Sequence, residues 1–149
     1  MPPVIRTAIP DEAEHLVATY EWLFAPPGSR PATWEPGRAA EALSEVITSK
    51  RSEVLLAEAG AEVVGLCTVY LDIRSVRFGD RAWVEDLSVH PDHRSQGVGK
   101  ALLDAAKDWG RARGATHLGL NSGTTRTDAH RFYEREAPGT WSLSFGWEL

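Results

Sequence analysis

The sequence is poor in the features that mark several protein classes. It has one cysteine, Cys67, among 149 residues, so no disulfide can form within the chain, and the apolar residues around it indicate a buried, inert thiol. No run approaches the roughly 18–20 apolar residues that a membrane span requires, and the first residues lack the layout of a signal peptide. These absences predict a cytoplasmic protein with no membrane partner.

An excess of basic residues is also missing. The chain has 16 Lys and Arg against 21 Asp and Glu, for a formal net charge of −5, which argues against nucleic acid as a partner and agrees with a cationic acceptor such as an amine. Two nucleotide-binding patterns are absent: no G-x-G-x-x-G follows an early strand, and no G-x-x-x-x-G-K-[ST] occurs. Hydrophobic residues make up 42% of the chain, enough for the core of one domain over residues 1–149.

The stretch 84–103 is the most informative part of the sequence. It predicts a strand, a proline turn, a glycine-bearing loop and the start of a helix. Arg94, Gly97 and Gly99 form the pattern R-x-x-G-x-G, in which the glycines let the backbone bend tightly and approach a ligand, while the free amides of the helix N-terminus favour an anion. The alternative is an ordinary turn with incidental glycines, but the flanking strand and helix favour a phosphate-binding site.

Charged residues near this loop support a small anionic ligand. Arg94 and Lys100 make the loop locally positive within an acidic protein. His90 and His93 invite a metal interpretation, but no cysteine or carboxylate cluster completes a metal site beside them. We therefore expect an anion at the loop and no metal.

The remaining pattern predicts alternating helices and strands. Strict alternation of apolar and polar residues over 141–149 is the cleanest strand signal in the chain. A strand, a helix and a strand in succession after residue 82 form a parallel unit with a right-handed crossover. The order predicts an α/β fold with a mixed sheet and helices on both faces. Its elements are strand 4–9, helix 11–24, a helix from Pro36, strands 52–59 and 63–73 as a hairpin, strand 82–89, a helix to Gly114, strand 116–121, helix 125–136 and strand 141–149.

Two motifs in this order resemble those of the GCN5-related N-acetyltransferase (GNAT) superfamily. The stretch 84–103 resembles the family's acyl-coenzyme A binding motif A, and the segment 121–134, with an asparagine ending a strand and an A-x-x-F-Y-E helix, resembles motif B. The run 125–136 also resembles aminoalkylphosphonate and other small-amine acetyltransferases, in which case Arg126 or Arg131 would meet an anionic group on the acceptor. The resemblance implies the GNAT fold, a central mixed, mostly antiparallel sheet with a splayed pair of parallel strands.

The resemblance also implies where acetyl-CoA would bind as the cosubstrate. In the family the pantetheine arm lies between the two splayed strands and bonds the strand backbone, which here implies the main chain at Leu87, Ser88 and Val89. Asn121 would hold a pantetheine amide, and Phe132 would pack beside the cofactor arm. The pyrophosphate would lie on the loop amides of Arg94, Ser95, Gln96, Gly97, Val98, Gly99 and Lys100.

Acyl transfer from a thioester to an amine uses an acid for the leaving thiolate and a base for the amine, each contributing roughly 10²–10⁴-fold. Tyr133 occupies the tyrosine position of F-Y-E, which implies the acid; the alternative is a buried helix tyrosine with a satisfied hydroxyl. Glu85 is the preferred base, acting through a water, or else a carboxylate that only attracts a cationic acceptor.

Alternation along the strand predicts the direction of these side chains. Trp83, Glu85, Leu87 and Val89 share one face, and Asp86 lies on the opposite face with a structural bonding role.

Two loops are relevant to where the acceptor amine would bind. The proline- and glycine-rich connector 25–34 is either a wall over a pocket, flanked by Trp22 and Trp34, or a solvated surface loop. After F-Y-E the family has a short stretch ending in Gly-Phe, whereas residues 135–141 read R-E-A-P-G-T-W. This departure weakens any transfer of substrate identity from the family.

The expected function is transfer of an acetyl group from acetyl-CoA to the primary amine of a small-molecule acceptor. Two alternatives remain on the same fold, a non-catalytic acyl-CoA sensor and a protein or peptide N-acetyltransferase. The apolar last strand also leaves pairing across a homodimer open.

Overall fold

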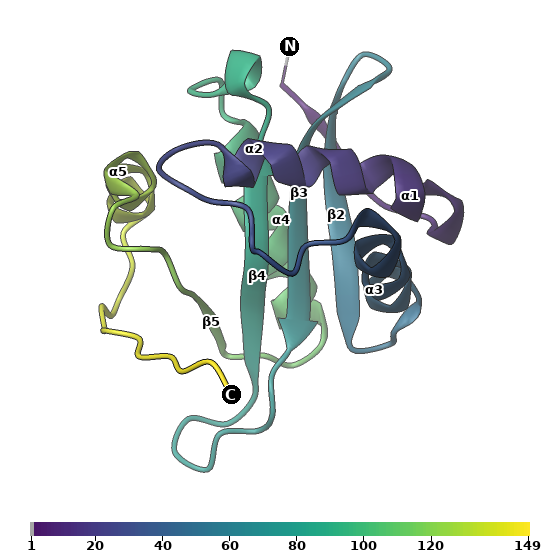
Figure 1. Ribbon diagram of the computed structural model, residues 1–149. Helices are drawn as coiled ribbons and strands as arrows, with labels where there is room; N and C mark the ends of the chain where they lie inside the picture. Colours follow the sequence, from purple (N-terminus) through teal and green to yellow (C-terminus); the bar gives the residue numbers. More distant parts are fainter. Residues whose placement is uncertain (1) are drawn as a thin grey trace.

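The computed structural model describes residues 2–149 and contains one five-stranded sheet in the order β1-β2-β3-β4-β5 (Figure 1). The strands β1 to β4 pair antiparallel with their neighbours, and β4 pairs parallel with β5. The expected mixed, mostly antiparallel sheet is therefore confirmed. The strands are β1 (Val4–Thr7), β2 (Ser52–Ala59), β3 (Glu62–Leu71), β4 (Arg81–Val89) and β5 (His117–Leu120).

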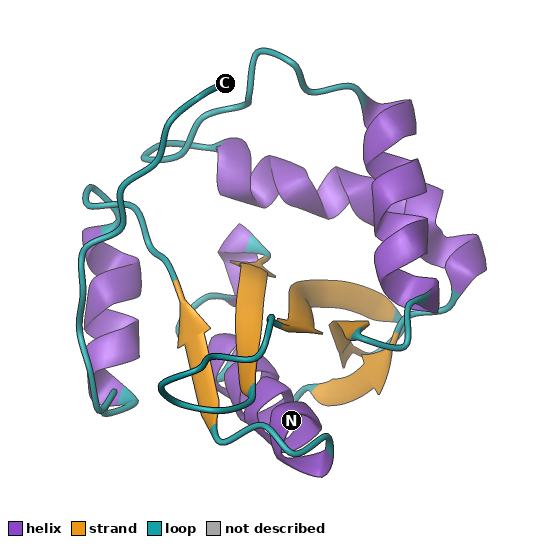
Figure 2. Cartoon of the chain, turned by 90° about the horizontal axis from the view of Figure 1, so that it is seen from below, coloured by secondary structure: helices purple, strands orange, loops and turns teal. Residues whose placement is uncertain are grey.

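Helices lie on both sides of this sheet, as expected (Figure 2). The helix predicted over residues 11–24 is present as a helical run in which 3₁₀ turns alternate with short α-helical segments. The α-helices are α1 (Ala13–Leu16), α2 (Glu21–Phe24), α3 (Pro36–Thr48), α4 (Val98–Ala112) and α5 (Thr127–Arg135), and the 3₁₀ helices are η1 (Pro10–Glu12), η2 (Val17–Tyr20) and η3 (Pro91–His93).

The core is divided by the sheet into two clusters. On one face the apolar stripe of α4, including Leu102, Ala106 and Trp109, packs against buried residues of β2, β3 and β4. On the other face Leu16 and Leu43, from α1 and α3, pack against buried residues of β2 and β3. Because β2 and β3 are covered on both faces, their sequences are nearly continuous runs of apolar residues.

β4 carries an irregularity at Glu85. In the antiparallel pairing with β3, Thr68 lies opposite Asp86 and Val69 lies opposite Val84, so Glu85 is an extra residue with no partner on β3. A β-bulge of this kind bends the strand and redirects the side chains around it.

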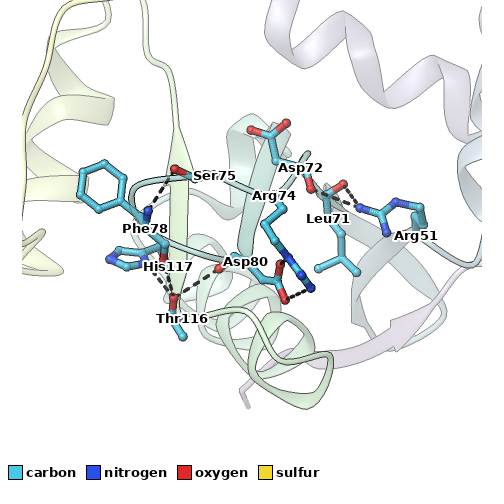
Figure 3. Close-up of polar contacts among 9 residues, drawn as sticks. All are labelled: Arg51, Leu71, Asp72, Arg74, Ser75, Phe78, Asp80, Thr116 and His117. Carbon is cyan, nitrogen blue, oxygen red and sulfur yellow. Dashed lines mark hydrogen bonds and ion pairs between the residues drawn. The ribbon is translucent and has the colours of Figure 1, made fainter.

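The parallel strands β4 and β5 are paired at one end, from Arg81 opposite His117, and unpaired at the other. Just before β5 begins, the Thr116 amide donates to the Asp80 carbonyl at 2.9 Å, and the Asp80 side chain forms an ion pair with Arg74 at 2.7 Å (Figure 3). At the far end the pairing stops at Val84 opposite Leu120. The rest of β4 therefore has no strand on its β5 side, and the expected splayed pair is present.

The prediction of a strand over residues 141–149 is wrong. These residues form no helix or strand, and they run past β5 as an extended tail (Figure 1). Alternation suits a sheet surface, but a strand forms only by hydrogen bonding to a neighbouring strand. The large apolar side chains of the tail are exposed: Trp141, Leu143, Phe145, Trp147 and Leu149.

Close packing of α4 on β3 depends on Gly65. A Cβ at this position would lie 2.8 Å from both Leu102 Cδ1 and Val98 Cγ1. We therefore expect Gly65→Val to lower the free energy of unfolding by about 1–3 kcal/mol in urea denaturation. Gly139→Val is the control, because a Cβ there would meet nothing within 4 Å, and its change should stay within about 0.5 kcal/mol. Equal stabilities of the two variants would contradict this packing.

Candidate active site

A cavity of about 170 Å³ occupies the gap between the separated ends of β4 and β5. It brings together five residues that the sequence singled out for the site, from β4, the end of β5, and α5 with the residue before it: Glu85, Leu87, Asn121, Arg126 and Tyr133. The remaining wall comes from α2 and from the loop after β5. The full lining is Leu23, Val84, Glu85, Asp86, Leu87, Leu120, Asn121, Ser122, Gly123, Arg126, Ala129 and Tyr133.

The glycine loop has a left-handed backbone at two positions. Gly97, the N-cap of α4, has a φ of 84°, and Ser95 has a φ of 60°. A Cβ on Gly97 would meet nothing within 4 Å, so the position needs glycine for its backbone conformation and not for space. Within the described part of the chain no side chain caps the N-terminus of α4. Its first amides therefore keep their positive potential for an anion.

The two cations of the loop have protein partners. Arg94 donates from Nε to the Val89 carbonyl at 3.3 Å and from its second guanidinium nitrogen to the Trp22 carbonyl at 3.4 Å. Its side chain therefore ties the loop to β4 and α2. The ammonium of Lys100 lies at 3.1 and 3.2 Å from carboxylate oxygens, so part of its charge is already neutralised. The two carboxylates are those of Asp104 and Glu136.

The other residues expected around a cofactor lie along the same edge of the sheet. Leu87, Ser88 and Val89 form the part of β4 that has no β5 partner. Phe132 packs on the first turn of α4, where a Cβ at Gly99 would lie 3.4 Å from its ring. Asn121 lines the cavity, and its amide donates to Ser144 Oγ of the C-terminal tail at 3.1 Å.

Tyr133 reaches the cavity from α5. Its ring lies 5.1 Å from that of Phe132, centroid to centroid. Burial raises the pKa of its hydroxyl to about 12, and the nearby Arg126 acts in the opposite direction. The phenol is therefore in its acid form near neutral pH.

The bulge in β4 changes the faces that strand alternation predicts. The prediction that Glu85 shares a face with Leu87 and Val89, opposite Asp86, is wrong. Because Glu85 is the extra residue, it lines the cavity on the α3 side of the sheet together with Asp86, whereas Leu87 and Val89 pack against the core under α4.

The two adjacent carboxylates differ in their partners. Asp86 accepts a hydrogen bond from the Tyr20 hydroxyl at 2.7 Å and another from Thr68 Oγ1 at 3.3 Å. Glu85 has no hydrogen bond or ion pair to any described residue. Burial and then the neighbouring charge of Asp86 raise its pKa, which suits a carboxylate that takes up a proton.

A second and larger cavity, of about 440 Å³, lies between α3, η2 and the sheet, and it shares Glu85 and Asp86 with the first. Trp34 forms part of its wall: it stacks on Tyr20 with ring centroids 5.7 Å apart and meets Phe24 edge-on at 4.7 Å. The segment between α2 and α3 passes in front of β3 and β4 (Figure 1). The pocket-wall alternative for the connector is thus correct at its Trp34 end.

One contributor to the site, Tyr20, was missed in the sequence, and Arg126 was named there only as a candidate partner for an anionic group on the acceptor. Tyr20 falls on the apolar face of its helix, so the pattern assigns it to the core, and only its contact with Asp86 shows its place. Arg126 lines the first cavity and donates to the Leu23 carbonyl at 3.0 Å, whereas Arg131 pairs with Asp128 on its own helix. No short-range signal marks either contact, because each joins residues far apart in the chain.

The histidines of the loop are engaged with their neighbours. His90 Nδ1 accepts a hydrogen bond from the Asp92 amide at 3.1 Å, and its ring lies edge-on to Trp22 with centroids 5.1 Å apart. Across residues 2–149 no cluster of three or more His, Cys, Asp or Glu side chains could hold a metal ion. Over the same residues no helix has the length and apolar content to cross a membrane.

Comparison with known proteins agrees with this geometry. The family model described as Acetyltransferase (GNAT) family matches residues 16–137. Among curated proteins, the uncharacterized N-acetyltransferase YhdJ of Bacillus subtilis is 48% identical over 59 residues, covering 40% of this chain and 42% of YhdJ. The aminoalkylphosphonate N-acetyltransferase of Salmonella typhimurium is 35% identical over 81 residues, covering 54% of this chain and 53% of that protein.

A solved structure extends the likeness over the whole fold. The aminoglycoside N-acetyltransferase AAC(6')-Iy, in complex with CoA, superposes with a TM-score of 0.83 at 17% identity and covers 98% of this chain and 94% of its own. At that identity the likeness concerns the fold. Because the family model spans most of the sequence and the sheet, loop and helices agree with it, this chain belongs to the GNAT acetyltransferase family.

Proposed function

We propose that this protein is an acetyl-CoA-dependent N-acetyltransferase that acetylates the primary amine of a small-molecule acceptor. The observation that carries the proposal is the meeting of two cavities at Glu85 and Asp86, one in the gap between β4 and β5 and one on the acceptor side. A thioester in the first cavity and an amine in the second would come together at the bulge of β4.

The residues present fit acetyl-CoA. The uncapped N-terminus of α4 and the open space at Gly97 suit a diphosphate, with Arg94 beside it. The free edge of β4 at Leu87, Ser88 and Val89 offers backbone groups to the pantetheine arm, and Asn121 faces the same gap. Bound acetyl-CoA supplies the thioester, and the rest of the chemistry falls to the protein.

The proposed reaction uses Glu85 and Tyr133 on either side of the thioester carbon. Glu85 takes a proton from the ammonium of the acceptor, and the amine nitrogen forms a bond to the carbonyl carbon. The C–S bond then breaks, and the Tyr133 hydroxyl gives its proton to the departing thiolate. The nitrogen releases its second proton to solvent. Glu85 then loses its proton and Tyr133 regains one by exchange with solvent, which restores both side chains and leaves the amide, CoA thiol and one proton as the net products. Free amides at the edge of β4 would stabilise the oxyanion.

The first prediction for the site concerns the glycine loop at Gly97. Gly97→Glu should abolish binding of CoA in isothermal titration calorimetry, because it adds bulk and negative charge where the diphosphate would lie. Gly114→Glu is a matched control, since Gly114 has nearly the same φ, 85°, and also open space around it, but lies beyond the other end of α4. If both variants bind CoA as the unmodified protein does, the loop is not the diphosphate site.

The second prediction concerns the acid. Tyr133→Phe should lower kcat by about 10²-fold or more while the affinity for CoA changes little, because only the proton donor is removed. Steady-state release of free thiol gives kcat, and calorimetry gives the affinity. Unchanged kcat would exclude Tyr133 from this role.

The third prediction concerns Glu85. Its carboxyl should titrate above the ordinary glutamate pKa in carbon-detected NMR, because burial and the charge of Asp86 both disfavour the ionised form. Asp86→Asn removes the like charge and should lower that pKa, whereas Asp108→Asn, at the far end of α4, should leave it unchanged. A Glu85 pKa that is insensitive to both substitutions would mean that the two carboxylates do not interact.

A further inference from the structure

We infer that the acceptor is an amine with a single positive charge and an apolar body, and that the cavity beside α3 selects for that body. This inference rests on the proposed function and names the substrate class for the same site. It follows from which groups in the larger cavity remain free to bind a ligand, and from where they lie.

The walls of this cavity are mainly apolar. Side chains from α3 and η2 form one side, including Val17, Ala42, Leu43 and Val46, and Trp34 covers them from the connector. A volume of about 440 Å³ lies in the ordinary range for small-ligand sites that bind through apolar contact with few polar groups. An aromatic ring or a branched or linear alkyl chain of several carbons would fit such a space.

Most polar groups in the lining are already bonded within the protein. Ser52 Oγ donates to the Val46 carbonyl at 2.8 Å. The Tyr20 hydroxyl and Thr68 Oγ1 both bond the carboxylate of Asp86. A polyhydroxylated ligand such as an aminosugar would have to break these bonds or leave those of its hydroxyls that face the apolar wall unpaired, and both are costly.

Three polar side-chain groups of the lining remain without a protein partner among the described residues: the hydroxyl of Tyr70, the indole N–H of Trp34 and the carboxylate of Glu85. Glu85 lies where the two cavities meet, so an ammonium bound there would be next to the thioester gap while its substituent extends toward α3. Of the two carboxylates in the lining, Glu85 is the one that accepts no hydrogen bond from the described residues, so a single ammonium group finds its direct partner there. A polycationic acceptor would place its other ammonium groups against Val46, Leu43 and Trp34.

Anionic acceptors fit poorly for a separate reason. Among the described residues that line the larger cavity, none carries a positive charge, whereas two carboxylates do face it. Arg126 faces the first cavity and is bonded to the Leu23 carbonyl. The phosphonate or carboxylate group of such an amine would therefore meet only the negative charges of Glu85 and Asp86 in this cavity.

The test is a series of linear primary amines from ethylamine to octylamine, with 2-phenylethylamine as an aromatic member. The full-length protein is assayed by release of free thiol from acetyl-CoA. Because each buried methylene favours binding, kcat/KM should rise with chain length by up to about fourfold per methylene and level off when the cavity is full. Spermidine, kanamycin and 2-aminoethylphosphonate should be poorer acceptors than hexylamine by about tenfold or more.

A pair of variants on α3 locates the selecting cavity. Ala42→Phe places a ring into the space, and we expect it to raise KM for hexylamine by about tenfold while KM for acetyl-CoA stays close to its original value. Glu41→Phe is the control, because Glu41 is the exposed neighbour of Ala42 on α3 and does not line the cavity. It should leave KM for hexylamine unchanged.

The outcomes separate this inference from the proposed function. If CoA binds and the polyamine or the phosphonate is the better acceptor, or if kcat/KM is flat along the series, the inference is wrong and the acetyltransferase stands. An unchanged KM for hexylamine in Ala42→Phe would likewise overturn it. If no amine yields thiol, or if CoA does not bind, the proposed function itself fails.

Discussion

The separation of β4 from β5 after Val84 is the constraint on which the rest of the site depends. A parallel pair that continued in register would fill the gap with backbone hydrogen bonds and leave no room for a ligand. Here the pair is fixed at one end by the Thr116 and Asp80 contacts and released at the other. The released edge carries peptide groups without a strand partner, and the bulge at Glu85 turns two carboxylates toward the same place. One inserted residue thus shapes both cavities.

The two adjacent carboxylates have different surroundings. Asp86 is bonded by Tyr20 and Thr68, which fixes its position and joins η2 to the sheet. Glu85 lacks such partners within the described chain, and burial raises its pKa. Different environments shift the pKa values of two neighbouring acids apart, and proteins commonly use such a difference to separate a structural carboxylate from a reactive one. The N-terminus of α4, which is the positive end of the helix dipole, follows the glycine loop. The site therefore has two carboxylates, Glu85 and Asp86, toward one end and a positive potential toward the other.

The sequence predicted the parts of the site that depend on local geometry. Gly97 needs a left-handed backbone at the start of a helix, and this requirement can be read from a few residues. The face of Glu85 could not be read in this way, because the bulge exists only relative to the register of β3. The C-terminal tail shows the same limit. Its alternation from Trp141 to Leu149 describes a strand surface, but no local pattern states whether a partner strand is present, and the sheet ends at β5.

The end of α2 is held from two sides. Arg94, from the glycine loop, bonds the carbonyl of Trp22, and Arg126, at the start of α5, bonds the carbonyl of the next residue, Leu23. The last carbonyls of a helix have no partner within it, so they accept such donors readily. The helix α2, whose Leu23 lines the cavity between β4 and β5, is therefore a common tether for the glycine loop and the start of α5. A shift of the glycine loop on binding an anion would therefore pull on the Trp22 carbonyl, and α2 would pass the displacement to the adjacent Leu23 carbonyl and so to Arg126 beside the cavity.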